Sequence, residues 1–174
     1  RLEQKIGFDR IRQIISDKCS TVYATERAAT ETFSNKASLI RKRLLLTDEM
    51  RLIMMFEDSF PSGGFIDCID FLKPLESTSS AIDLLSLRKL KTMLETLRKV
   101  TAFFEDIKDG VYPNLKRMSA PIMSFPEVQR RIEGIIDRYG DIKDTASDIL
   151  YEIRRSLREK EGAISRRMSA ILKS

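Results

Sequence analysis

The sequence predicts an all-α protein, in which an irregular helical core is followed by a small β-hairpin and one long C-terminal helix. Glycine and proline are scarce, with 7 and 5 residues among 174, so few positions interrupt a helix. Charged residues make up 33% of the chain, which is typical of amphipathic helices with exposed faces. Apolar residues recur at steps of three and four positions in several segments, which is the spacing of one helix face.

Three helices are expected in the first third of the chain. The second should cover residues 21–32, where small alanines allow close packing, and the third should cover residues 36–57. The apolar positions of the third helix are spread too widely for one stripe, so we expect it to be buried on more than one side. The first helix presents an apolar face formed by Phe8, Ile11, Ile14 and Ile15.

A break and a further long helix occupy the middle of the chain. The Pro-Ser-Gly-Gly sequence at residues 61–64 interrupts the helical pattern, and a short helix should follow it and end near Pro74. Ser86 is expected to start the fifth helix. Its apolar residues keep a regular spacing of three and four positions: Leu87, Leu90, Leu94, Leu97 and Phe104.

A short helix and a hairpin are expected near residue 130. Ser124 and Glu127 have the spacing of a capping box, in which each side chain binds the other residue's backbone N–H, so a helix should begin there. Ile136 and Ile142 flank a Tyr-Gly-Asp turn at residues 139–141. Apolar residues on both sides of a glycine-containing turn predict a small β-hairpin.

A long helix should follow the hairpin and continue to the last residue. The carboxylate of Asp144 is expected to cap this helix by accepting the free N–H groups of its first turn. Six apolar residues recur at steps that keep them on one narrow stripe, as in a coiled coil, although Lys160 stands where an apolar residue is expected. This stripe, called the seam below, consists of Leu150, Ile153, Leu157, Ile164, Met168 and Ile171.

The residue types of a catalytic centre are missing from the sequence. The chain has no histidine, which is the commonest general base and metal ligand, and it has no Gly-x4-Gly-Lys-Ser/Thr phosphate loop. Cys19 and Cys68 lack a metal-binding spacing and are expected to be reduced thiols. Asp67 and Asp70 are interpreted as part of a solvated helix face. We therefore predict no catalytic, cofactor-binding or metal-binding residue in this chain.

Charge and hydropathy restrict the partners only broadly. The net charge of +5 permits contact with nucleic acid without requiring it. No apolar run approaches the roughly 20 residues needed to span a bilayer, so no membrane partner is expected. The sequence has no recognisable signal peptide, and we expect a cytoplasmic location.

Three stretches resemble the second bacterial MutS family. Residues 2–11, Leu-Glu-Gln-Lys-Ile-Gly-Phe-Asp-Arg-Ile, are similar to the opening of that family. Residues 63–67, Gly-Gly-Phe-Ile-Asp, resemble its Gly-Gly-Ile-x-Asp turn. Residues 136–155 resemble its hairpin and helix start, which read roughly I-D-x-x-G-x-I-x-D-x-A-S-x-x-L-x-x-I-R-R. The three stretches occur in the family's order along the chain.

The resemblance implies that this chain is part of a longer protein. Residues 1–145 would form a helical core domain, and residues 146–174 would be the truncated start of a lever helix that leads to a nucleic-acid clamp. The family's ATPase, which uses ATP and Mg, and its Smr nuclease domain would lie outside these residues. The resemblance also implies a homodimer that acts on branched DNA to suppress recombination, or on stalled ribosomes.

Two interpretations of the long helix remain open. Its basic residues could contact phosphate groups, or they could form a solvated face balanced by Glu152, Glu159 and Glu161. As an alternative to the lever function, a stand-alone helical adaptor could bind a partner helix through the seam. Weak self-association through the uncovered seam is also expected. The candidate nucleic-acid contacts are Arg154, Arg155, Arg158, Arg166, Arg167 and Lys173.

Overall fold

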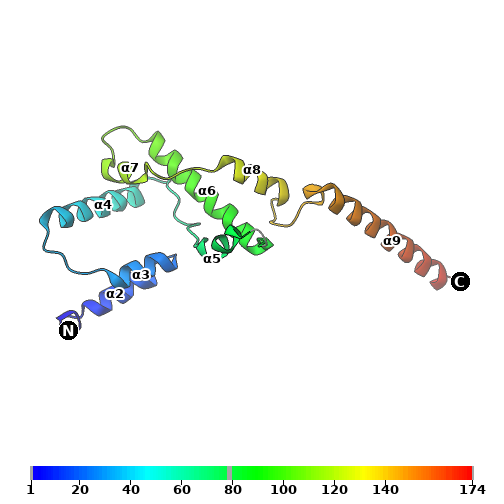
Figure 1. Ribbon diagram of the computed structural model, residues 1–174, viewed down its shortest axis with the longest axis horizontal. Helices are drawn as coiled ribbons and strands as arrows, with labels where there is room; N and C mark the ends of the chain where they lie inside the picture. The colour runs from blue at the N-terminus through cyan, green and yellow to red at the C-terminus, as the bar shows by residue number, and fades with distance from the viewer. Residues whose placement is uncertain (1, 78–79, 174) are drawn as a thin grey trace. The chain divides into compact units, whose positions relative to one another are not determined.

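A computed structural model describes residues 2–77 and 80–173. Helices account for most of this part of the chain, and the described residues contain no β-strand (Figure 1). The all-α prediction is therefore confirmed. The chain divides into two compact units, one up to Phe125 and one from Pro126 on, called the first and second unit below. No helix in the described ranges is long and apolar enough to cross a membrane.

The first unit begins with a helical hairpin. Its helices are α1 (Leu2–Lys5), α2 (Phe8–Asp17) and α3 (Val22–Thr30), and α2 packs along α3 (Figure 1). Gly7 separates α1 from α2 with a φ of 71°, a left-handed conformation that glycine adopts without steric cost. Thr21 begins α3 as its N-cap, because its hydroxyl accepts a hydrogen bond from the Ala24 N–H at 3.1 Å.

The core of the first unit lies where three helices meet (Figure 1). They are α4 (Ala37–Phe56), α6 (Leu84–Asp106) and α7 (Pro113–Ser119). Two aromatic rings of α6 pack edge to face at the centre, with a third ring from the loop after α4 against both of them. The buried core residues are Ile53, Val100, Phe103, Phe104 and Leu115, and the third ring is Phe60.

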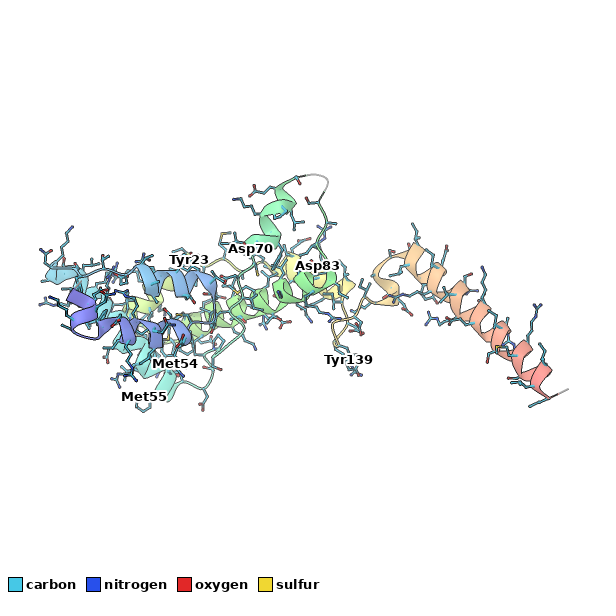
Figure 2. The ribbon with its side chains drawn as sticks, turned by 90° about the horizontal axis from the view of Figure 1, so that it is seen from below. Tyr23, Met54, Met55, Asp70, Asp83 and Tyr139 are labelled. Atoms are coloured by element: carbon cyan, nitrogen blue, oxygen red, sulfur yellow. The ribbon has the colours of Figure 1, made fainter. Side chains whose placement is uncertain are left out.

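The prediction that the third helix is buried on more than one side is wrong for this chain. Only Glu49 and Ile53 of α4 are buried, and much of its remaining apolar surface is exposed. Figure 2 marks Met54 and Met55 on this helix, and both side chains are more than half exposed. The apolar residues of α4 are spread around the helix, but among the described residues no element of the first unit covers its other side.

A buried carboxylate joins α4 to α7. Glu49 is only 9% exposed, and its two oxygens accept hydrogen bonds from the backbone N–H groups of Asn114 and Leu115 at 3.1 and 2.7 Å. The Asn114 amide also donates to it at 2.6 Å. These donors belong to the first turn of α7, whose N–H groups have no partner within the helix. Glu49 therefore caps α7 from a position 65 residues earlier in the chain.

The Gly-Gly-Phe-Ile-Asp stretch fits closely against α6. Gly64 has a φ of 86°, and a Cβ atom added there would lie 2.3 Å from the Thr96 hydroxyl oxygen. Only glycine allows this approach. Three residues later, Asp67 accepts a hydrogen bond from the Val22 N–H at 2.5 Å, which caps the start of α3. The stretch therefore connects the helical hairpin with α6.

The start of α6 differs from the sequence prediction, whereas the end of α5 agrees with it. Asp83, not Ser86, is the N-cap of α6, because its carboxylate accepts hydrogen bonds from the Ser86 N–H and hydroxyl at 2.9 and 2.7 Å. These hydrogen bonds from Ser86 lower the pKa of Asp83. The short helix α5 (Ile69–Leu72) ends near Pro74, as predicted, and a 3₁₀ turn that contains this proline, η1 (Lys73–Glu76), follows it directly.

The second unit contains two helices joined by a turn. They are α8 (Pro126–Ile135) and α9 (Asp148–Leu172), and a 3₁₀ turn, η2 (Asp144–Ala146), precedes α9. The predicted small β-hairpin is not formed. Ile136 and Ile142 make a single isolated antiparallel bridge. The turn itself takes up residues 137–141, so almost no residues between α8 and η2 are left to pair as strands.

Candidate interaction site on the second unit

The turn before α9 is held by its own backbone and by one aspartate. The Asp137 N–H donates to the Asp141 carbonyl, and the Lys143 N–H donates to the Ile135 carbonyl, both at 2.8 Å. The Asp137 carboxylate accepts from the Tyr139 and Asp141 N–H groups at 2.8 and 2.9 Å. These backbone hydrogen bonds, the one from Asp141 most strongly, lower the pKa of Asp137. The turn is therefore held by both backbone and side-chain hydrogen bonds.

The aromatic side chain at the tip of this turn is exposed. Tyr139 is 72% accessible, and Figure 2 shows it at the end of the loop. The guanidinium of Arg138 lies over its ring, 4.7 Å from the ring centre, in a cation–π contact. Gly140 completes the turn with a φ of 87°, which explains the glycine in the Ile-Asp-x-x-Gly pattern.

The prediction that Asp144 caps the long helix is wrong. Ser147 is the N-cap of α9, because its hydroxyl accepts a hydrogen bond from the Leu150 N–H at 3.2 Å. Asp144 instead lies at the start of η2 and binds two arginines of α9. One carboxylate oxygen accepts from Arg154 at 2.6 Å, and the other accepts from Arg158 at 2.9 Å. The hydrogen bond from Arg154, followed by that from Arg158, lowers the pKa of Asp144.

The seam of α9 is exposed along its length. None of the residues of α9 is buried, and Leu150 at its beginning is half-buried. At 1.5 Å per residue the 25 residues of α9 extend for about 37 Å. An apolar stripe of this length in contact with water is suited to packing against another helix. The other seam residues, between 55% and 72% exposed, are Ile153, Leu157, Ile164, Met168 and Ile171.

Three of the six basic residues predicted to contact nucleic acid form ion pairs within the second unit. Arg154 and Arg158 bind Asp144, and Arg155 donates to Glu159 of the next helical turn at 3.1 Å. Within residues 2–77 and 80–173, the remaining three form no ion pair. These are Arg166, Arg167 and Lys173, all exposed.

Helical geometry places most of these side chains on one side of α9. With 3.6 residues per turn, all except Arg167 lie within about a third of the circumference of the helix, and Arg167 borders the seam. Arg155 shares its side of the helix with Glu159. A phosphate backbone that follows α9 would therefore meet its free positive charge only near the C-terminal end. Contact between the six basic residues and nucleic acid stays a prediction.

The two aspartates and two cysteines singled out in the sequence do not form a binding or catalytic cluster in the described residues. Asp67 precedes α5 and caps α3, while Asp70 lies within α5, so the two do not form a solvated pair on one helix. Cys68 is buried and Cys19 is half-buried, and both are free thiols, as predicted. Burial raises the pKa of Cys68, which makes its thiol less reactive. In the described part of the chain, no cluster of three or more His, Cys, Asp or Glu residues could hold a metal ion.

The first unit also contains an apolar cleft along α2 and α3. Charged residues at its rim bind one another: Arg12 pairs with Glu3 at 2.9 Å, and Arg27 lies 3.7 Å from Glu31. Arg43 of α4 also binds Glu31, which lowers the pKa of that carboxyl. Because these charges are neutralised within the unit, the cleft has no evident means of recognising a charged ligand. Its apolar walls include Phe8, Ile15, Ala24, Ala28 and Phe33.

The Ser147 cap and the contact of Asp144 with two arginines were not predicted from the sequence. Only the cap had a local signal. Ser147 is followed by Asp148 in the first turn of α9, and Ser followed by an acidic residue is a common helix start. The arginines that bind Asp144 are four residues apart, so they lie on one face of α9, but their partner could not be identified from that spacing alone.

The second unit thus combines a hydrogen-bonded turn, a capped long helix and an exposed apolar seam. No model of a known protein family matches the sequence. Similar curated proteins do exist. Endonuclease MutS2 of Alkaliphilus oremlandii is 26% identical over 170 residues, which cover 97% of this chain and 21% of that protein.

Two further relatives have the same name. Endonuclease MutS2 of Listeria welshimeri is 26% identical over 175 residues, covering 99% of this chain and 22% of the relative. Endonuclease MutS2 of a Geobacillus species is 25% identical over 178 residues, covering all of this chain and 22% of the relative. The chain is thus a distant homologue of the MutS2 proteins, and the resemblance found in the sequence is confirmed. It spans about a fifth of the length of these relatives.

Proposed function

We propose that this chain is a non-catalytic helical core and lever segment of a MutS2-like ATPase. In this proposal, residues 1–145 form the core and residues 146–174 form the start of a lever helix. The lever couples motion of the ATPase to a nucleic-acid clamp. The observation that carries the proposal is the similarity to MutS2 proteins over nearly the whole of this chain but only about a fifth of theirs.

The form of α9 supports a lever. A helix transmits motion as a single body when its residues are continuous and its start is fixed. The 25 residues of α9 contain no proline and one glycine, Gly162, and its first turns are tied to the preceding turn through Asp144. A displacement applied at one end would therefore be carried over about 37 Å.

The exposed apolar surfaces support a longer protein. The seam of α9 would be covered by a second lever helix that returns from the clamp. The uncovered side of α4 would be covered by a later part of the same protein. Each surface is too apolar to be a typical solvent-facing helix side. The family homodimer, if formed by the intact protein, need not use either surface.

The remaining parts of the proposed activity lie outside these residues. ATP and Mg would bind in the ATPase, and any nuclease activity would belong to a separate domain. The target would be branched DNA, where the protein suppresses recombination, or a stalled ribosome, and the location would be cytoplasmic. Of the six predicted basic contacts, the three without an ion pair, Arg166, Arg167 and Lys173, fit phosphate contact best, because their charges need not be released from another partner.

A second candidate is a stand-alone adaptor that binds a partner helix. The same exposed seam favours it, because amphipathic helices are bound through apolar residues at three- and four-residue steps. The reading frame distinguishes the two candidates. Under the lever proposal, the genomic frame continues beyond Ser174 and reaches a Gly-x4-Gly-Lys-Ser/Thr phosphate loop. A stop codon directly after Ser174 would contradict the lever proposal and support the adaptor.

Biochemistry of the complete product provides the second test. If the frame continues, the full-length protein should hydrolyse ATP, and purified residues 1–174 should not. The control is a full-length protein with the lysine of its phosphate loop replaced by alanine. Nucleotide-dependent phosphate release by residues 1–174 alone, above the rate of that control, would show that the assignment as a non-catalytic segment is wrong.

A further inference from the structure

Three pieces of the second unit meet at one carboxylate. Asp144 begins η2, and its two oxygens accept from Arg154 and Arg158 of α9 at 2.6 and 2.9 Å. The same nitrogen of Arg154 also donates to the carbonyl of Ile142, on the returning side of the turn, at 2.9 Å. The turn, η2 and the first half of α9 are thus connected through side chains as well as through the backbone.

The positions of the two arginines determine what this connection restrains. Four residues apart, they lie one above the other on the same face of α9. A single contact would fix one distance and leave the helix free to pivot about it. Two contacts one helical turn apart, on separate oxygens of one carboxylate, oppose both tilting of α9 away from η2 and rotation about its own axis.

Apolar packing does not provide this restraint. No residue of α9 is buried, and Arg154 is one of few half-buried side chains in the helix. The ion pairs themselves are partly exposed, with side-chain accessibilities of 35% for Asp144, 39% for Arg154 and 59% for Arg158. Exposed ion pairs contribute little to the free energy of unfolding. Their effect here is on direction more than on stability.

We propose that Asp144, Arg154 and Arg158 form a joint that sets the direction in which α9 leaves the turn, so that α8, the turn and α9 move as one body. This inference rests on the proposed lever function, and it makes the two arginines positioning residues. It makes contact with nucleic acid a secondary role for both, because each guanidinium already donates to Asp144. A lever with a loose start would lose motion at the joint and transmit less of it to its far end.

The test measures the distance between α8 and α9 in residues 1–174. Spin labels are attached at Glu127→Cys on α8 and Ser165→Cys on α9, both exposed positions, in a background of Cys19→Ser and Cys68→Ala. Circular dichroism first establishes that this background keeps its helices. Excess unlabelled chain is added so that a labelled copy rarely pairs with another labelled copy, and only distances within one chain are measured. The expected result for the background chain is one narrow distance distribution from pulsed electron paramagnetic resonance.

The decisive variant is Asp144→Ala, which should broaden that distribution while the helical content stays constant. The matched control is Glu159→Ala, which also removes one carboxylate, but one that binds a single arginine within α9. It should leave the distribution narrow. Asp144→Glu, which keeps the charge, should restore a narrower distribution than Asp144→Ala does. If Asp144→Ala reduces helical content, Arg158→Ala replaces it, because that change removes only the contact farther from the turn.

Two results would contradict the proposed joint. One is a broad distance distribution in the background chain, and the other is an unchanged width of the distribution in the Asp144→Ala or Arg158→Ala variant. Neither measurement involves nucleotide, nucleic acid or the rest of the longer protein. If the joint is disproved, the lever proposal is still decided by the reading frame. If the joint is confirmed but the frame ends at Ser174, the chain is a rigid adaptor and not a lever.

Discussion

The core of the first unit and the long helix of the second are stabilised in opposite ways. The core buries Phe103 and Phe104 between three helices, and even its charged residue, Glu49, is almost inaccessible. In contrast, α9 has no buried residue and is held at its start by hydrogen bonds. The core is stabilised by burial within the first unit. We expect α9 to need a partner helix on its exposed seam, because isolated helices are marginal in water.

Removing an aromatic ring from the core should cause the largest change in the free energy of unfolding. Phe103→Ala deletes a side chain that packs against both Phe60 and Phe104, and it should lower the free energy of unfolding by about 3–5 kcal/mol. Leu157→Ala, on the exposed seam, should change it by less than about 0.5 kcal/mol. Urea denaturation followed by circular dichroism measures both. Equal losses for the two variants would mean that α9 is packed as tightly as the core.

The buried carboxylate should have the next largest effect. Glu49→Ala leaves the N–H groups of Asn114 and Leu115 without an acceptor, at a cost of about 1–3 kcal/mol in the free energy of unfolding. Asp48→Ala is the matched control, since it removes the neighbouring carboxylate, which makes an exposed pair with Arg51. The control should cost less than about 0.5 kcal/mol. A Glu49→Ala variant as stable as the control would refute the cap of α7.

The N-cap of α9 should have a local effect of about 1 kcal/mol. Ser147→Ala removes the acceptor of the Leu150 N–H, so amide hydrogen exchange in the first turn of α9 should become faster. Ser156→Ala, in the middle of the same helix, should leave that exchange unchanged. Mass spectrometry of the peptic peptides covering residue 150 provides the measurement. Unchanged protection in Ser147→Ala would show that another group caps the helix.

The seam should control self-association without affecting the core. We expect the unmodified chain to associate weakly through α9, and Leu157→Lys with Ile164→Lys to make it monomeric at unchanged helical content of the first unit. Ser156→Lys with Ala163→Lys adds the same charge at the same spacing outside the seam. Sedimentation equilibrium of the three proteins distinguishes the faces. A monomer at every concentration for the unmodified chain would exclude pairing through the seam.

The smallest effect should be the acid response of the turn. Arg154 and Arg158 hold the pKa of Asp144 below its ordinary value of about 3.9. A lowered folded-state pKa means that the contact stabilises the turn above about pH 4 and is lost as the pH falls through the folded-state pKa. Carboxyl chemical shifts in an NMR titration should place the midpoint of Asp144 below its ordinary value. A midpoint for Asp144 at or above the ordinary value would contradict its contact with the two arginines.

The helices were largely predictable from the sequence, because the spacing of apolar residues within each segment indicates a helix. The regular pattern from Leu87 to Phe104 predicted α6, and the seam predicted α9. The caps were less predictable. Both Asp83 and Ser86 are good cap residues three positions apart, and so are Asp144 and Ser147, so propensity alone could not choose between them.

Contacts between distant residues could not be predicted. Nothing near Glu49 indicates that it caps a helix 65 residues away, and nothing near Asp67 indicates that it reaches Val22. The hairpin failed for a different reason. Apolar residues on both sides of a glycine turn predicted strands, but Ile135 already belongs to α8, and Asp137 closes the turn with its own side chain. The candidate basic site was located by charge alone, which could not reveal that Arg154 and Arg158 bind Asp144.

The long separation of Glu49 from its partners has a consequence for a chain that is still being synthesised. At 5–20 residues per second, about 3–13 s pass between the addition of Glu49 and that of Asn114. During that interval the carboxylate has no helix terminus to bind, and the rings of α6 have no α7 to cover them. The nascent first unit therefore completes its core only when α7 has emerged from the ribosome, and until then its apolar residues are available to chaperones.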